Sequence, residues 1–373
     1  MSTQKNNGIQ AVHRVNTESH WALFCRVVDN HGDLGVCWRL SCQLAARGHQ
    51  VHLHVDDASA LQWMAPQGCA GVDILNWPTD DTVINASALP DVVIEAFGCE
   101  LPLGYQAAMG RASTPPVWVN LEYFSAEDAA LRNHGLPSPV MSGPAKGLTK
   151  WFFYPGLSPQ SGGVLGPGVD GRVNSDHEHE QLSLQRDKIS WPTKPPRISL
   201  FCYEPASLGL WLQQLHEQTP AVHLTVTAGR ATQAVRHALQ AWQLPPSFEV
   251  SELPYLSHPE FDQLLAAQDL NLVRGEDSLV RAIWAGQAFL WQIYPQDDGA
   301  HWPKLQAFLK ATQAPTVVVQ AHLAWNADQP TALPALTPAH WAQWSAWALA
   351  LRRRLQAETD LLTRLESFVA AHG

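Results

Sequence analysis

The chain has 373 residues, 46% of them hydrophobic and 16% charged, which is enough apolar material for two packed domains and excludes a globally disordered chain. Its formal net charge of −10 argues against a broad nucleic-acid-binding surface, since phosphates are bound by basic faces. No apolar run reaches the roughly 18 residues of a membrane-spanning helix, so no membrane partner is expected. Residues 1–20 lack the apolar core of a secretory signal and are predicted to form a flexible, polar tail.

Residues 21–155 alternate short apolar runs with helix-length segments. A helix is predicted over residues 34–47, with Gly48 ending it. The predicted strands are 22–28, 51–55, 72–75, 91–97 and 117–123. Strands separated by helices pair in parallel through right-handed crossovers, so this segment is expected to be a doubly wound, Rossmann-like α/β domain.

The composition changes over residues 156–196, which are rich in glycine, serine and charge and are predicted to be a linker or loop. The alternation then restarts and continues to residue 335, which predicts a second Rossmann-like domain. Its predicted strands are 197–203, 222–229, 248–253, 269–275 and 288–295, and its clearest helices are 205–218 and 231–242.

Residues 336–373 have a helical pattern that begins at Thr337, a good N-cap residue, followed by Pro338 at the first helical position. Apolar residues then recur at helical spacing, which predicts one long amphipathic helix or two helices with a break. Such a helix needs an apolar surface to cover, and we expect it to cross back over the first domain.

The cysteines and histidines do not form a recognisable metal-binding pattern. The six cysteines include no C-x-x-C pair, so free thiols in a reducing cytoplasm are expected. His52 and His54 alternate along one strand, and His177 and His179 lie in an acidic loop, but neither pair has the further ligands of a zinc site. No metal and no other cofactor is therefore predicted.

Polar residues follow the first predicted strand in CRVVDNHGDLGVCWRL, residues 25–40. Ligands of open α/β sheets bind beyond the carboxyl ends of the strands, where Asp29 and Asp33 flank a glycine turn. Gly32 and Gly35 would permit a close backbone approach. The dinucleotide fingerprint G-x-G-x-x-G is absent. The alternative interpretation is that Asp33 only caps a helix and Asp29 only ends a strand.

A second polar turn lies in NLVRGEDSLVRAIWAG, residues 271–286, where a strand again precedes a helix. The free N–H groups and positive dipole of a helix N-terminus favour phosphate. Arg274 and Ser278 would add donors, and Glu276 would bind sugar hydroxyls. A capping box followed by a solvated face is the alternative.

Two α/β domains with such turns predict a cleft between them, which is the architecture of GT-B nucleotide-sugar glycosyltransferases. Many of these enzymes need no metal, because the helix dipole and side chains stabilise the leaving diphosphate. The fold alone leaves the substrate open. A glycan or lipid acceptor, or a non-catalytic nucleotide-binding module, therefore stays an alternative, although a module binding an anionic nucleotide has no need of paired aspartates.

Four segments resemble the EarP family of bacterial protein-arginine rhamnosyltransferases, which modify translation elongation factor P. They are FCRVVDNHGDLGVCWRL (24–40), VNLEYFSAED (119–128), RGEDSLVRAIWAG (274–286) and WQIYPQDD (291–298). The resemblance runs from about residue 21 to about residue 303 in matching order and spacing. It departs at His31, where the family usually has an aromatic residue, and over residues 160–190.

The resemblance implies an inverting GT-B enzyme that moves L-rhamnose from dTDP-β-L-rhamnose to an arginine of elongation factor P, without a metal. Asp33 then matches the general base, Asp29 an aspartate that orients the guanidinium, and Glu276 an acid near the donor sugar. The implied donor-binding residues are Gly32, Arg274, Gly275, Asp277 and Ser278, with Phe201, Tyr203, Phe261, Tyr294 and Gln296 as weaker correspondences for which core packing is the alternative.

The implied chemistry is physically coherent. Deprotonating a guanidinium fully at neutral pH would cost roughly 8 kcal/mol, from a pKa near 13. Carboxylates at positions 29 and 33 would instead hold the cation, and Asp33 would accept the proton as the C–N bond forms.

Overall fold

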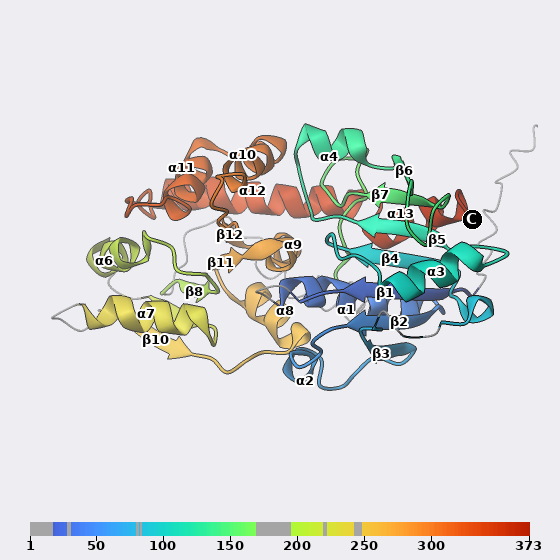
Figure 1. The fold of residues 1–373 in the computed structure, drawn as a ribbon. Coiled ribbons are helices and arrows are strands. Elements are labelled where there is room, and N and C mark those ends of the chain that lie inside the picture. The colour runs from blue at the N-terminus through green and yellow to red at the C-terminus, as the bar shows by residue number, and fades with distance from the viewer. Residues whose placement is uncertain are drawn as a thin grey trace, which may run out of the picture.

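The computed structural model describes residues 18–27, 31–79, 82, 84–168, 195–218, 222–241 and 248–373. The predicted tail up to residue 17, Asp29, and most of the predicted linker, with His177 and His179, lie outside the described residues. The described chain forms two α/β halves side by side, with a long helix running along both of them (Figure 1).

The first half contains a seven-stranded sheet in the order β3-β2-β1-β4-β5-β7-β6, in which only β6 is antiparallel to its neighbour. The strands are β1 (His20–Cys25), β2 (Gln50–Val55), β3 (Val72–Asn76), β4 (Val92–Ala96), β5 (Val117–Leu121), β6 (Pro137–Pro139) and β7 (Thr149–Phe153). All residues of β4 and β5 are buried, as expected for central parallel strands covered on both faces. The sequence analysis predicted the first five of these strands and missed β6 and β7.

Helices cover both faces of this sheet. They are α1 (Gly32–Ala46), α2 (Leu61–Met64), α3 (Leu103–Arg111) and α4 (Asp128–Asn133), with the short 3-10 helix η1 (Ala86–Ala88). Helix α1 starts two residues earlier than predicted and ends one residue earlier, and the predicted stop at Gly48 is confirmed by its φ of +91°, which favours glycine.

The second half contains a five-stranded parallel sheet in the order β10-β9-β8-β11-β12. Its strands are β8 (Arg197–Leu200), β9 (His223–Val226), β10 (Glu249–Glu252), β11 (Leu270–Arg274) and β12 (Ala288–Gln292). Its helices are α6 (Leu208–Gln218), α7 (Arg230–Gln240), α8 (His258–Ala267), α9 (Gly275–Ala285), α10 (His301–Ala311) and α11 (Thr316–Trp325). Strand β8 ends three residues before its predicted end, so residues 201–203 lie beyond the carboxyl end of the sheet.

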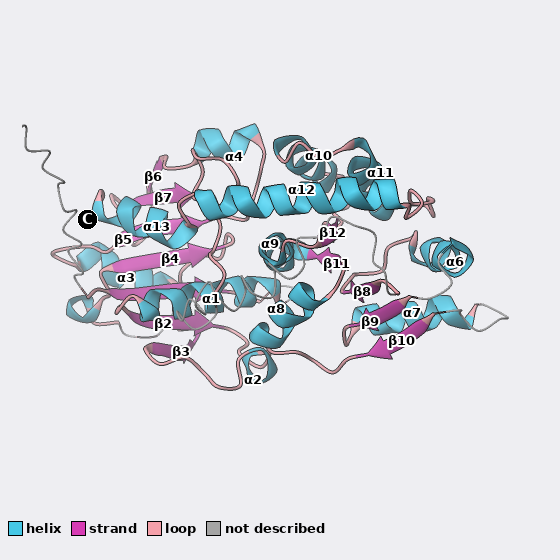
Figure 2. Cartoon of the chain, turned by 180° about the vertical axis from the view of Figure 1, so that it is seen from behind, coloured by secondary structure: helices cyan, strands magenta, loops and turns pink. Residues whose placement is uncertain are grey.

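The C-terminal segment forms two helices, α12 (Pro338–Ala357) and α13 (Leu361–Ala370), and Thr337 caps α12 as predicted. Helix α12 packs on the second half, where Trp344 Nε1 donates to the Phe289 carbonyl at 2.7 Å. Helix α13 instead buries leucines among the core residues of the first half. The chain therefore crosses between the halves at the break (Figure 2). In the described part of the chain, no helix is long and apolar enough to cross a membrane.

Candidate active site

A cleft of about 300 Å³ opens between the two halves, at the carboxyl ends of the second sheet's strands. The start of α1 and helix α2 contribute from the first half, and the turns after β8, β9, β10 and β11 contribute from the second. The residues predicted from the sequence that line it are Gly32, Phe201, Tyr203, Phe261, Arg274, Gly275, Glu276, Asp277 and Ser278. The second predicted turn therefore lines the cleft throughout, whereas the first contributes Gly32, and Asp33 next to it is not among the lining residues.

Asp33 lies in the first turn of α1, and the Tyr123 hydroxyl donates to its Oδ2 at 3.1 Å. The side chain does not cap the helix, because the N-cap residue is His31 and it makes no side-chain capping bond, so the capping alternative is wrong. Burial raises the pKa of the Asp33 carboxyl to about 7, with a further increase from the charge of Glu276 and an opposing effect of Tyr123. A carboxyl that titrates near neutral pH has the proton affinity of a general base.

Glu276, in the first turn of α9, is held by contacts from two directions. Its Oε2 accepts the backbone N–H of Phe124 at 2.8 Å, and its Oε1 pairs with the ammonium of Lys304 on α10. Burial raises the pKa of Glu276, and Lys304 opposes that rise. The ammonium also lies over the ring of Tyr123, 5.6 Å from its centroid. Lys304 therefore pairs with Glu276 directly and also contacts the tyrosine that is bonded to Asp33.

Arg274 presents a flat cation to the cleft. Its guanidinium lies 4.5 Å from the ring centre of Phe201 and 4.6 Å from that of Tyr203, and its Nη1 donates to the Cys202 carbonyl at 3.2 Å. Stacking of this kind holds an arginine in one orientation while leaving charge for an anion. The following Gly275 has a φ of +68°, which a side chain would strain at the point where α9 begins.

The structure gives Ser278 and Asp277 other contacts than the expected ones. The Ser278 hydroxyl donates to the Arg274 carbonyl within the helix, which leaves its oxygen free to accept a hydrogen bond. The Asp277 carboxylate pairs with Arg39 Nε at 3.4 Å and with Arg281 Nε at 3.9 Å. Both residues nevertheless line the cleft, so their contacts with the donor stay a prediction.

Arg39 joins the two halves through a buried ion-pair network. It lies on α1 with a fully buried side chain and donates to both carboxylate oxygens of Asp262 on α8, at 2.8 and 3.0 Å. A Cβ at Gly35 would lie 3.3 Å from Met64 Cε, which is tight, and in ordinary van der Waals contact with His258 Nε2 and Asp277 Oδ2. The close backbone approach expected at Gly35 therefore serves helix packing, whereas a Cβ at Gly32 would meet open space.

The weaker correspondences separate into two groups. Phe201, Tyr203 and Phe261 line the cleft, and Phe261 packs edge-on against Phe201 with 5.4 Å between ring centres. Tyr294 and Gln296 are exposed beyond the end of β12 and do not line it. Tyr294 packs edge-on against Tyr203 with 5.4 Å between ring centres, so it contacts a residue that lines the cleft.

The sequence analysis missed several residues that the structure brings to this site. Tyr255 is 59% exposed, lines the cleft, and packs against Trp63 of α2 with 4.9 Å between ring centres. Arg230 follows the turn after β9, where a strand is followed by a glycine and a cation, the reverse of the order Arg274-Gly275 after β11. Tyr123 lies inside a quoted motif but was given no role, and no sequence signal points to Lys304.

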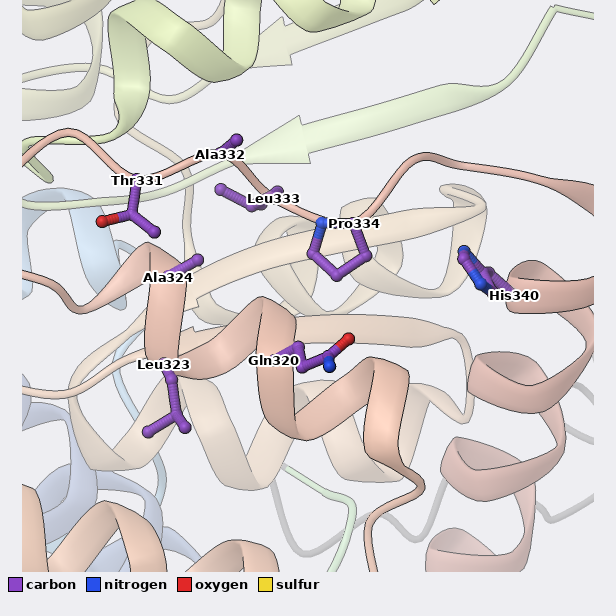
Figure 3. A pocket seen from close by; sticks show the side chains of 8 residues that line it. All are labelled: Gln320, Leu323, Ala324, Thr331, Ala332, Leu333, Pro334 and His340. Atoms are coloured by element: carbon purple, nitrogen blue, oxygen red, sulfur yellow. The ribbon is translucent and has the colours of Figure 1, made fainter.

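The described part of the chain shows no second candidate site in a groove beside α11 or among its potential metal ligands. A shallow groove beside α11 is lined by mostly apolar residues and contains no acidic or basic side chain other than His340 (Figure 3). Within the described ranges, no three His, Cys, Asp or Glu side chains gather as a metal site requires.

Comparison with known proteins agrees with this geometry. The family model for the elongation-factor P rhamnosyltransferase EarP matches residues 21–370. A Pseudomonas putida protein-arginine rhamnosyltransferase is 40% identical over 93% of this chain and 98% of its own length, and the Pseudomonas aeruginosa one is 38% identical over 82% and 87%.

Solved structures show the same relationship. The structure described as "Structural basis for EarP-mediated arginine glycosylation of translation elongation factor EF-P" aligns with a TM-score of 0.60 at 29% identity, over 95% of this chain and 99% of that one. The glycosyltransferase SnogD from Streptomyces nogalater shares the fold, with a TM-score of 0.54 at 14% identity over 96% and 100% of the two chains. The predicted GT-B fold is confirmed, and the chain belongs to the EarP family of protein-arginine rhamnosyltransferases.

Proposed function

We propose that this chain transfers L-rhamnose from dTDP-β-L-rhamnose to an arginine side chain of elongation factor P, with inversion at the sugar carbon and without a metal ion. Membership in the EarP family supports the reaction class and the acceptor. The observation that carries the proposal is that Tyr123 and Phe124, neighbours in one loop, bond to Asp33 of α1 and Glu276 of α9, which brings one acid from each half to the same place. Burial raises the pKa of the Asp33 carboxyl to about 7. A translation factor as acceptor places the reaction in the cytoplasm.

In the proposed step, a guanidinium nitrogen attacks the anomeric carbon from the face opposite the nucleotide. The new C–N bond forms while the bond to the diphosphate oxygen breaks, and dTDP leaves with that electron pair. The proton lost from the nitrogen passes to the Asp33 carboxylate, which avoids forming a free neutral guanidine. Attack from the opposite face converts the β-linked donor into an α-linked product.

The leaving dTDP is an anion, and the α9 side of the cleft supplies the positive groups that it requires. The first turn of α9 and the stacked cation of Arg274 both line this cleft. A helix N-terminus and an oriented arginine stabilise developing charge on a diphosphate. The exposed ring of Tyr255, supported by Trp63, offers a flat surface for the thymine base.

The remaining assignments follow from charge. Glu276, already held by Lys304 and the Phe124 N–H, is proposed to orient the sugar or the incoming cation rather than to accept the proton. Asp277 is proposed to act through the packing of α1 against α9, because Arg39 and Arg281 engage its carboxylate. Asp29 stays a prediction from the resemblance.

The test combines purified chain, dTDP-β-L-rhamnose and elongation factor P, and measures the intact mass of the acceptor. We expect a mass increase of one deoxyhexose, located on an arginine by fragmentation, and no increase without donor. Asp33→Asn should bind donor with unchanged affinity and lose turnover. An unchanged acceptor mass, under conditions where calorimetry shows donor bound to the wild-type chain, refutes the proposed function.

A further inference from the structure

The short loop that follows β5 contacts both acids of the site, although these acids belong to different halves. The Tyr123 hydroxyl donates to Asp33 Oδ2 on α1 at 3.1 Å. The next residue, Phe124, donates its backbone N–H to Glu276 Oε2 on α9 at 2.8 Å. One turn of chain therefore sets the position of Asp33 relative to Glu276.

The ring of Tyr123 is held on two sides. It stacks on Phe97 with 4.7 Å between ring centres and 24° between planes, and the Lys304 ammonium lies over it. Phe97 has a φ of +58°, which is uncommon for a residue with a large side chain, and its N–H donates to the Leu121 carbonyl at 2.8 Å. A costly backbone conformation that places one ring under another is typical of functional sites.

We propose that Tyr123 is a positioning residue for the reaction, and that its hydroxyl holds Oδ2 of Asp33 so that Oδ1 is left to receive the proton of the acceptor. This inference rests on the proposed role of Asp33 as the base. Its physical content is one hydrogen bond between a phenol and a carboxylate, and this bond stabilises the ionised form of Asp33 over the protonated form.

The other groups around Asp33 either favour or disfavour its ionised form. Burial and the nearby carboxylate of Glu276 both disfavour the ionised form, and the pKa of Asp33 is accordingly raised. The Lys304 ammonium pairs with Glu276 and so compensates part of that repulsion. The thiol of Cys37 on α1 is also within electrostatic reach of Asp33, as that of Cys25 is of Tyr123. Tyr123 is the group that favours ionisation by a direct hydrogen bond, so its loss should raise the pKa of Asp33 further.

Tyr123→Phe removes this hydrogen bond and keeps the ring between Phe97 and Lys304. Losing one such bond to a charged group should move the acidic limb of the kcat profile upward by about one pH unit. From a pKa of about 7, that change reduces the ionised fraction at pH 7 roughly fivefold and hardly affects it at about pH 9. We therefore expect a kcat deficit that shrinks as pH rises, with the KM for the donor nearly unchanged.

Tyr105→Phe is the matched control, because it removes the same atom from a buried tyrosine of α3 whose ring packs against Phe24. Its pH profile should equal that of the wild type. An acidic limb that does not move in Tyr123→Phe, or a raised donor KM at unchanged kcat, overturns the inference.

A second measurement separates this inference from the proposed function. In chains carrying ¹³C-labelled aspartate carboxyl groups, the Asp33 signal is the one missing from Asp33→Asn, and its titration needs no substrate. We expect its midpoint to rise in Tyr123→Phe and to stay in place in Tyr105→Phe. An unmoved midpoint overturns the positioning role whatever the activity, whereas full turnover by Asp33→Asn overturns the base assignment whatever the midpoint.

Discussion

Asp33→Asn should stabilise the fold while it abolishes turnover. Burial raises the pKa of the Asp33 carboxyl from 3.8 to about 7, so the native structure disfavours the ionised form that the proposed reaction requires. Asparagine has nearly the same shape and carries no charge. Its side-chain oxygen can still accept the Tyr123 hydroxyl, so the substitution removes the unfavourable charge and keeps the contact.

The direction of the pH dependence follows from proton counting. Below about pH 4 the carboxyl is protonated in both the folded and the unfolded chain, and above about pH 7 it is ionised in both. Between these values the folded chain holds the proton and the unfolded chain has lost it, so the free energy of unfolding falls as pH rises. A difference of about three pH units sets an upper limit of roughly 4 kcal/mol. Since the side chain is only partly buried, we expect about 1–3 kcal/mol.

The assay is urea unfolding of both chains at about pH 4.5 and about pH 8. The advantage of Asp33→Asn over the wild type should be larger at the higher pH by about 1–3 kcal/mol. Asp328→Asn, at an exposed position after α11, is the matched control and should differ from the wild type equally at both values. Equal differences at both pH values for Asp33→Asn would refute the reasoning, because they would mean that Asp33 titrates alike in both states.

Three further substitutions test the contacts around the cleft. Lys304→Met leaves the buried carboxylate of Glu276 without its cation, and we expect kcat to fall about tenfold to a hundredfold in steady-state assays; a wild-type kcat would contradict this. Arg274→Lys keeps the charge but loses the flat face stacked on two rings, so calorimetry should show donor affinity weakened about tenfold. Unchanged donor affinity would remove Arg274 from the donor site. Arg39→Met removes the bidentate partner of Asp262 and leaves Asp277 to the more distant Arg281, so it should lower the free energy of unfolding by about 3–5 kcal/mol in urea titrations. A cost below about 1 kcal/mol would show that the network adds little.

The central strands that the sequence predicts, such as β4 and β5, are short apolar runs whose composition explains their burial. Strand β7 was missed because TKWFF contains Lys150, a residue type that is rare in buried strands. The structure accommodates it through contacts with other strands, since its ammonium pairs with the buried Glu95 of β4 and lies over the Trp118 ring of β5. Such compensation depends on which strands become neighbours, and the local pattern does not contain that information.

The candidate site, like the fold, could be predicted only in part. Each polar turn was predictable, because it follows an apolar strand and precedes a helix, and both turns contribute lining residues to the cleft. The partners of the individual side chains could not be predicted, because they lie far away along the chain and some of them come from the opposite half of the molecule. Arg39 inside the apolar run VCWRL implies a buried acidic partner. Nothing along the chain identifies Asp262 and Asp277 as those partners.

The ion pairs between the halves bear directly on catalysis. Asp33 and Arg39 lie six residues apart on α1, which is about 9 Å along the helix axis, and Glu276 and Asp277 are neighbours on α9. The contact between Arg39 and Asp277 therefore sets the register of the helix that carries the proposed base against the helix that carries the donor turn. Most of the cleft wall belongs to the second half, so donor binding depends little on that register. Proton transfer from an acceptor to Asp33 depends on it strongly, because the reacting atoms must approach from both halves. We therefore expect the buried network to position the two helices for catalysis. Stability alone would not require it, since apolar side chains would pack the same interface at a lower free-energy cost.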